Sequence, residues 1–340
     1  MVGVTISINV FSRKKTFEGN PVSAAGPLER AWKRLGRMRR IFPYYVTILL
    51  VSVSLFPGCE AIFGPEEVKI PFGYDPDFDY LSVLKSSPAY AYEATDGLPD
   101  FTYQDSTDEN LRELKNTYNL ENASGDGDEL SKIFNLLKWV HQTIRHDGGN
   151  TGPGPENSLS ILQYCQETGN GVNCVMMAIV LNEAYLAMGF QSRVVHGNAK
   201  KFIFNGDWHA YNMVYSTTLS KWLFVDPTYQ AYFLDEHGNP LSIAELREHL
   251  RQGETLILND DADYNGQEAD RTSYLHYLTK NLYRFSCAVQ SAFGNYWIFN
   301  IPDGTQRTFF HLDPKNDRQE GPGLAENHFT SNPTYYWSEP

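Results

Sequence analysis

The amino-acid sequence predicts an α+β fold, in which several helices come first and an antiparallel sheet follows them. Residues 128–188 place apolar side chains at helical spacing in successive segments. Residues 192–225 contain short segments rich in Val, Tyr, Phe and Trp, which are typical of strands. The helical and strand-like segments do not alternate along the chain, and that order favours an α+β fold over a βα fold.

Composition supports a globular protein and excludes some classes of function. The chain has 340 residues, of which 41% are hydrophobic and 14% aromatic, so it can bury a real core. Its 28 Lys and Arg against 41 Asp and Glu give a net charge of −13. A net acidic chain is a poor candidate for binding nucleic acid, because that binding depends on basic contacts to phosphates. Four cysteines are too few for a small disulfide-dense scaffold.

Residues 1–58 have the features of an export signal. A cluster of Arg and Lys precedes an uncharged, mostly apolar run over residues 41–56, which Gly58-Cys59 follows closely. This ending resembles a bacterial lipoprotein signal, in which the cysteine, here Cys59, becomes the lipidated first residue. A cleaved secretory signal, an uncleaved membrane anchor and a core helix are the competing interpretations, and the run is short for a membrane span of about 20 residues. Met38 is a second candidate start.

Removal of the signal would leave 282 residues with 19 Lys and Arg against 39 Asp and Glu, a net charge of −20. We therefore expect an acidic protein of the cell envelope, attached to a membrane by a lipid and facing the periplasm or the cell surface.

The rest of the chain divides into three predicted parts. Residues 59–127 are a tether and an irregular N-terminal region, residues 128–258 are the core, and residues 259–340 pack a C-terminal helix and strands on that core. Predicted helices span residues 108–118, 128–144, 159–166, 174–188, 242–252 and 273–289. Predicted strands span residues 192–196, 201–204, 209–215, 221–225, 296–301 and 307–312, with a turn at 216–220 and a loop at 259–270.

Cys174 is the strongest candidate for a chemically active residue. It follows the Gly-rich turn 169–171 and opens an apolar helix that Gly189 closes. A helix N-terminus stabilises a thiolate and offers free backbone N–H groups to an oxyanion. A buried structural thiol is the alternative interpretation.

A base and an acid follow Cys174 along the chain. His209 begins one predicted strand, and Asp226 ends the next, before Pro227-Thr228. A hairpin through residues 216–220 would bring the two side chains to the same end of the sheet. In such a group, the acid orients the imidazole and stabilises its charged form. Taken singly, each residue would more often be a surface, capping or turn residue.

Three segments around these residues resemble the transglutaminase-like superfamily. Gly171-Val172-Asn173-Cys174, Trp208-His209-Ala210-Tyr211-Asn212 and Trp222 to Thr228 look like the Cys, His and Asp segments of that family. The close likeness runs from about residue 138 to residue 238. With the lipoprotein-like start, the whole chain resembles exported members from Bacteroidetes-type bacteria.

The resemblance implies a papain-like core, in which the Cys helix packs against an antiparallel sheet that carries the His and the Asp. It also implies attack of a thiol on an amide, loss of ammonia or an amine, and a thioester that water or another amine resolves. Trp139, Gln142 and Trp208 are candidates for the cleft or for oxyanion contacts. The resemblance identifies neither the substrate nor a cofactor, and calcium sites known in other members have no counterpart in this sequence.

The remaining candidates have plainer interpretations. Cys165 and Cys287 are either buried thiols or a disulfide pair. His141, His146 and His196 lack the spacing of a metal site, and the acidic run Asp260-Asp261-Ala262-Asp263 is more typical of a solvated loop than of a calcium site. We therefore predict no metal and no cofactor.

Taken together, the sequence predicts an exported cysteine enzyme that acts on a peptide or protein substrate through Cys174, His209 and Asp226. A non-catalytic surface binding or scaffold protein on the same fold is the alternative. The sequence leaves hydrolysis and crosslinking equally open.

Overall fold

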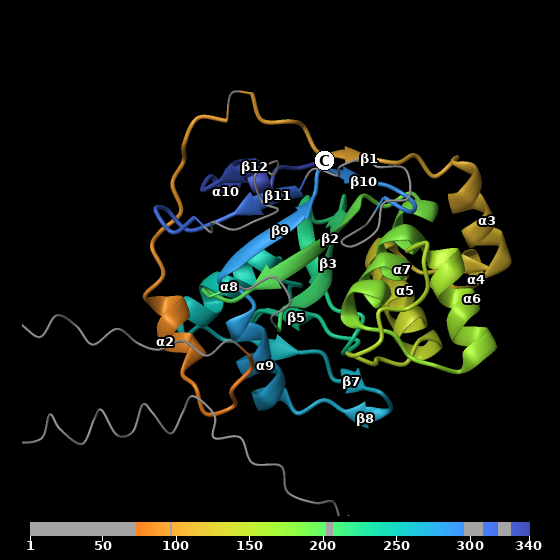
Figure 1. Ribbon diagram of the computed structural model, residues 1–340, viewed down its shortest axis with the longest axis horizontal. Helices are drawn as coiled ribbons and strands as arrows, with labels where there is room; N and C mark the ends of the chain where they lie inside the picture. Colours follow the sequence, from red (N-terminus) through yellow and green to blue (C-terminus); the bar gives the residue numbers. More distant parts are fainter. Residues whose placement is uncertain (1–72, 96, 202–206, 296–308, 319–327) are drawn as a thin grey trace, which may run out of the picture. The chain divides into compact units, whose positions relative to one another are not determined.

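A mixed sheet organises the described part of the chain (Figure 1). The computed structural model describes residues 73–95, 97–201, 207–295, 309–318 and 328–340. Its helices are α2 (Tyr80–Lys85), α3 (Glu109–Thr117), α4 (Leu120–Ser124), α5 (Glu129–Thr143), α6 (Ser158–Thr168), α7 (Cys174–Ala187), α8 (Ile243–Gln252), α9 (Arg271–Lys280) and α10 (Pro333–Tyr336). The longer strands are β2 (Ser192–Asn198), β3 (His209–Ser216), β4 (Lys221–Val225), β9 (Arg284–Ala288), β11 (Phe309–Leu312) and β12 (His328–Thr330).

These six strands form one sheet in the order β12-β11-β9-β2-β3-β4. β11 and β12 are parallel, and the other neighbours are antiparallel. Six two-residue strands form three further pairs: β1 (Thr102–Tyr103) with β10 (Gln290–Ser291), β5 (Phe233–Leu234) with β6 (Ile257–Leu258), and β7 (Asp263–Tyr264) with β8 (Gln267–Glu268). The predicted α+β class is confirmed.

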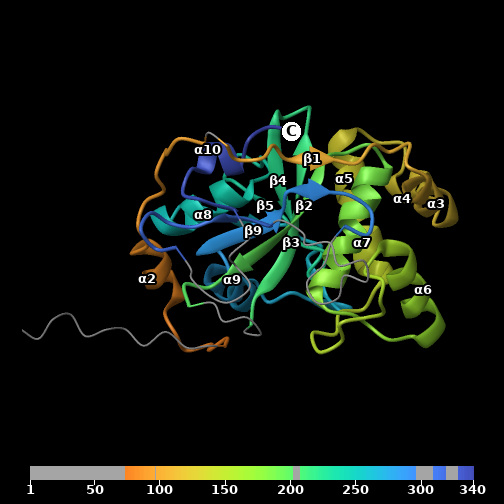
Figure 2. The same ribbon diagram turned by 45° about the horizontal axis from the view of Figure 1, so that its top comes forward.

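Helices cover both faces of the sheet, and for this reason β2 and β3 are buried along their whole length. Because side chains alternate along a strand, Ala210 and Val214 pack with α3, α5, α6 and α7. Tyr211, Met213 and Tyr215 face the opposite core with α8 and α9. Figures 1 and 2 show α5, α6 and α7 gathered on one side of the sheet, with α8 and α9 on the other.

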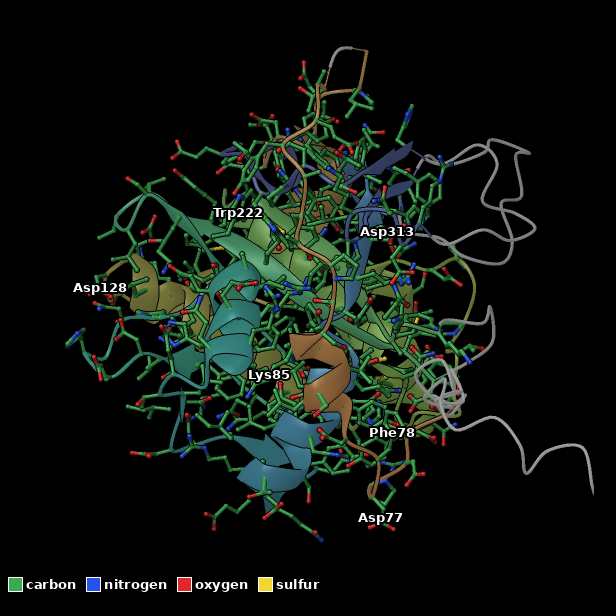
Figure 3. The ribbon with its side chains drawn as sticks, turned by 90° about the vertical axis from the view of Figure 1, so that its left-hand side faces the viewer. Asp77, Phe78, Lys85, Asp128, Trp222 and Asp313 are labelled. Carbon is green, nitrogen blue, oxygen red and sulfur yellow. The ribbon has the colours of Figure 1, made fainter. Side chains whose placement is uncertain are left out.

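The predicted N-terminal region is built into this arrangement. α2 packs against α8 and α9. In Figure 3, α2 is the helix between the labelled residues Phe78 and Lys85. β1 adds a short parallel pair with β10. Among the described residues, no helix combines the length and the apolar composition needed to cross a membrane.

Helix boundaries follow the predicted caps closely. Asp128 caps α5 by accepting a hydrogen bond from the Ser131 N–H at 2.8 Å, and Ser242 forms a capping box with Glu245 at the start of α8. Gly189 follows α7 with a φ of +85°, in the left-handed region that favours glycine. The hairpin between β3 and β4 turns at residues 216–220, as predicted.

The prediction of one helix over residues 273–289 is wrong in its second half. α9 ends at Lys280, and residues 284–288 form β9 in the middle of the sheet. The carbonyl of Asn281 lies against Gly197 so closely that a Cβ there would come within 2.1 Å of the oxygen. Tyr211 also donates a hydrogen bond to that carbonyl, at 3.3 Å. Contacts with β2 and β3 thus hold the chain in a turn where local sequence favours a helix.

The structure also differs from the expectations for the loop 259–270 and for the C-terminal segment 259–340. The predicted loop 259–270 contains the β7–β8 hairpin. The segment 259–340 also supplies β9, β11 and β12 to the same sheet as β2, β3 and β4, so the core extends beyond residue 258. The predicted signal, Cys59 and the strand at 296–301 lie outside the described residues, as does all but the first residue of the strand predicted at 201–204.

Candidate active site

Close backbone contacts position the segment that leads into Cys174. Val172 pairs with His146 in an isolated parallel bridge, with hydrogen bonds from the Val172 N–H to the Arg145 carbonyl (3.0 Å) and from the Asp147 N–H to the Val172 carbonyl (2.8 Å). Gly171 makes this pairing possible, because a Cβ at that position would lie only 2.3 Å from the Arg145 oxygen. The glycine therefore brings His146 beside the segment that leads into α7.

Asn150 and Asn173 then fix the first turn of α7. The Asn150 side chain donates to the Gly171 carbonyl at 2.7 Å, and the backbone carbonyl of Asn150 accepts from the Asn173 N–H at 2.8 Å. Asn173 caps the helix by accepting from the Met176 N–H at 3.1 Å. Cys174 is the first residue of the helix, as predicted, and its side chain is half-buried.

His209 and Asp226 meet at one end of the sheet. His209 is the first residue of β3 and is 2% exposed, and its Nε2 lies 2.6 Å from Oδ2 of the fully buried Asp226. The same Oδ2 accepts a hydrogen bond from the Tyr274 hydroxyl at 2.7 Å, while Oδ1 accepts from the Thr228 N–H at 2.9 Å. Three groups therefore hold a carboxylate that water does not reach.

The Cys174 thiol completes this group. The side chains of His209 and His146 and the backbone of Ala210 act on this thiol, and they lower its pKa. Because Nε2 of His209 is bound to Asp226, Nδ1 is the ring nitrogen available to the thiol. The structure thus brings together Cys174, His209 and Asp226, and it adds His146 on the other side of the sulfur.

The charges of the group favour a thiolate and an imidazolium. Burial alone would raise the pKa of Cys174, but the hydrogen bonds from His146 and His209 and the charge of His209 lower that pKa to about 6. Burial would lower the pKa of His209, but the charge and hydrogen bond of Asp226 raise it to about 10. Burial also opposes ionisation of Asp226, and the charge of His209 nevertheless holds the pKa of that carboxyl below its usual value.

Aromatic rings enclose the imidazole. Tyr277 and Tyr229 present their rings at steep angles to His209, with centroids 5.4 and 6.3 Å away. Lys280 is bound to Asp207, two residues before His209, at 2.7 Å. These contacts fix the position of the imidazole from the α9 side of the sheet.

The three candidates for the cleft or the oxyanion site lie in different places. Trp139 packs against Tyr118 and the helical core, with ring centroids 6.1 Å apart. Gln142 is exposed in the last turn of α5. Trp208 is half-buried beside His209, and its ring lies 4.4 Å from that of His196. Their roles at the site stay predictions.

The structure also places the remaining candidates of the sequence analysis. Cys165 and Cys287 are both free and buried, so the thiol alternative holds and the disulfide does not. His141 binds the Pro227 carbonyl (3.0 Å) and Asp263 (2.7 Å). Asp261 accepts hydrogen bonds from the side chains of Gln230 and Asn259. Within the described ranges, no cluster of three or more His, Cys, Asp or Glu side chains could hold a metal ion.

His146 and Tyr274 are site residues that sequence reasoning did not find. Neither residue stands in a recognisable motif: His146 follows the end of α5, and Tyr274 lies in α9, 48 residues after its partner Asp226. The turn at Gly171 was the available signal for His146, since it indicated a close backbone approach whose partner the sequence alone does not reveal.

Comparison with known proteins relates this part of the chain to a known family. Residues 116–227 match the family model of the transglutaminase-like superfamily, and the match includes Cys174, His209 and Asp226. No curated protein matches the chain.

Similar solved structures include a proposed cysteine protease from Cytophaga hutchinsonii, with 18% identity, a TM-score of 0.26, and coverage of 48% of this chain and 55% of that one. A transglutaminase from red sea bream has 14% identity and a TM-score of 0.27, and the match covers 51% of this chain and 35% of that one. This chain therefore spans about half of the first structure and about a third of the second. The family match covers about a third of this chain, and residues 116–227 resemble the transglutaminase-like superfamily.

Proposed function

We propose that this protein is an exported, lipid-anchored cysteine enzyme that acts on amide bonds of peptides or proteins by thioester acyl transfer. One observation carries the proposal: the half-buried Cys174 thiol contacts His209, and His209 contacts the fully buried Asp226. A binding or scaffold protein would have no need for a carboxylate buried against an imidazole that faces a thiol with a lowered pKa.

The proposed reaction begins with the thiolate of Cys174 and the imidazolium of His209. The sulfur attacks the amide carbon, a C–S bond forms, and the carbonyl electrons move onto oxygen. Backbone N–H groups at the start of a helix are free of intrahelical partners, so the N-terminus of α7 can stabilise the developing oxyanion. The C–N bond then breaks, and Nδ1 of His209 gives its proton to the leaving nitrogen. Asp226 keeps the imidazole oriented through Nε2.

The acyl group left on Cys174 can react in two ways. Water, deprotonated by His209, gives hydrolysis, whereas a primary amine gives a new amide and therefore crosslinking. Both outcomes use the same three residues, so the difference lies in which nucleophile reaches the thioester.

The release of ammonia from glutamine-containing peptides tests the activity. We expect release by the wild-type protein and none by Cys174→Ala. Parallel reactions with and without an added primary amine separate the outcomes, because mass spectrometry distinguishes a carboxylate product from an amine adduct. If neither ammonia nor cleaved peptide appears, and Cys174 reacts no faster than Cys165 and Cys287 with a thiol reagent, the binding alternative replaces the enzyme.

The export part of the proposal rests on residues 1–58 and Cys59 alone. We expect metabolic labelling with a fatty acid to mark the wild-type protein and not Cys59→Ala. Expression from Met38 should retain export, and a requirement for residues 1–37 would exclude Met38 as the start.

A further inference from the structure

His146 is held beside the reacting sulfur by contacts on both sides of its backbone. Its bridge with Val172 places it alongside the residue two positions before Cys174. From the other side, Asn265 accepts a hydrogen bond from the His146 N–H at 2.8 Å and donates one to the His146 carbonyl at 3.0 Å. Asn265 lies in the turn of the β7–β8 hairpin, beyond the segment that matches the family model.

The ring of His146 is oriented as firmly as its backbone. Nδ1 lies 3.0 Å from the Tyr264 hydroxyl, and the two rings meet edge to face with centroids 5.6 Å apart. With Nδ1 occupied, Nε2 is the ring nitrogen available to Sγ of Cys174, whose pKa the His146 side chain lowers. If the Tyr264 hydroxyl donates to Nδ1, the imidazole carries its proton on Nε2 and donates it toward the sulfur.

We propose that His146 is a further catalytic residue, whose Nε2–H donates a hydrogen bond first to the Cys174 thiolate and then to the oxyanion formed on attack. The proposal rests on the function proposed above. After attack, the oxygen is bonded to the same carbon as Sγ, so a donor that touched the sulfur needs only a small shift to reach the oxygen.

The two histidines at the sulfur have different partners, and this separates their roles. His209 is bound to the buried carboxylate of Asp226, which stabilises a charged ring and suits a residue that carries a proton to the leaving nitrogen. His146 is bound to the phenol of Tyr264, and no carboxylate is bound to its ring in the described part of the chain. His146 therefore donates a hydrogen bond throughout and transfers no proton.

Two reagents separate this role from a merely structural one. Iodoacetamide alkylates Cys174 by displacement of iodide, and this step forms no oxyanion. 4-Nitrophenyl acetate acetylates Cys174 through a tetrahedral oxyanion and releases 4-nitrophenolate. Alkylation therefore reports the supply of thiolate, and the ratio of the acylation rate to the alkylation rate reports stabilisation of the oxyanion. Both rates are measured on the purified wild-type protein and its variants, with mass spectrometry of the Cys174 peptide.

We expect His146→Ala to lower the ratio of acylation to alkylation by about a hundredfold to a thousandfold, the range typical of a lost oxyanion donor. His146→Gln keeps an N–H₂ donor near the position of Nε2 and should restore most of the ratio. Tyr264→Phe, which removes the group that orients the ring, should give a smaller loss.

His141→Gln is the matched control. His141 anchors the same hairpin through Asp263, and no described contact joins it to the sulfur. The variant should leave the ratio unchanged.

Three outcomes would overturn the proposal. An unchanged ratio in His146→Ala, with fast alkylation of the wild-type protein, would remove the role of His146 and leave the proposed function intact. An equal loss in His141→Gln would show that the hairpin and not the imidazole matters. Slow alkylation of wild-type Cys174 with no acylation would remove the proposed function and this inference together.

Discussion

Cys174, at the end of the sheet, and Cys287, in its middle, have very different surroundings in one fold. Cys287 is fully buried in β9 between Val195 and Phe310. Burial raises its pKa, despite the opposing effects of Arg193 and Tyr336. Cys174 is held by two imidazoles and a backbone N–H, which lower its pKa to about 6 against the same effect of burial. The comparison shows that polar partners, and not burial, decide whether a thiol is reactive here.

Replacement of each cysteine by alanine should give the largest difference in turnover between the two sites. Cys174→Ala should reduce amide turnover by about a thousandfold or more, because no other group can form the thioester. Cys287→Ala should keep most of the turnover while lowering the thermal midpoint, since it leaves a cavity in the sheet core. Turnover assays and thermal unfolding of the two variants check this, and loss of turnover in both with normal folding would contradict it.

Removal of the charge behind His209 should have the next largest effect. Asp226→Asn keeps the shape of the side chain but removes the carboxylate that raises the pKa of His209. We expect turnover to fall about a hundredfold or more, as in other groups of this kind. Cys287 should show no change in its slow reaction with iodoacetamide. Unaltered turnover in this variant would mean that the carboxylate has no part in the reaction.

The alkylation rates of Cys174 and Cys287 should depend differently on pH, an effect smaller than the two losses of turnover above. The lowered pKa means that Cys174 ionises on passing upward through about pH 6, while Cys287 stays protonated at pH 7. Alkylation of Cys174 should therefore rise through pH 6, and at pH 7 it should exceed that of an ordinary thiol by about tenfold.

The same profile should change again near pH 10, where His209 loses its proton. In His209→Ala, the lower midpoint should move toward that of an ordinary thiol. A wild-type midpoint above pH 8 would show that the imidazoles do not hold a thiolate.

Tyr274→Phe should give the smallest of these effects. It removes one hydrogen bond of 2.7 Å to Asp226 and leaves those from His209 and Thr228. We expect a loss of turnover of about threefold to tenfold, the size of one ordinary hydrogen bond, because the carboxylate keeps its other partners. Kinetics at fixed pH measure the loss, and a drop as large as that of Asp226→Asn would assign Tyr274 a larger role.

The sequence alone predicted the local parts of this architecture well. The caps at Asp128 and Ser242, the hairpin between β3 and β4, and the start of α7 at Cys174 depend on neighbouring residues, and each lies where the pattern predicts it. Cys174, His209 and Asp226 stood in recognisable segments, so their proximity followed once the hairpin was assumed.

The parts that escaped prediction depend on contacts between distant segments. β9 has apolar residues that also fit a helix, and only the neighbouring strands β2 and β11 decide its conformation. The pairing of His146 with Val172 needs the backbone approach at Gly171, and the β7–β8 hairpin that clamps His146 lies more than a hundred residues further along the chain.

The position of β9 has a consequence for how the chain folds and how it can be divided. The segment that matches the family model ends at residue 227, yet β2 pairs with β9 at residues 284–288. Until that strand is synthesised, β2 is an unpaired edge rich in buried side chains, which is a site for aggregation. Long-range pairing of this kind also slows folding. A fragment cut at the family boundary should therefore be insoluble, and a nascent chain should require protection until residue 288 has left the ribosome.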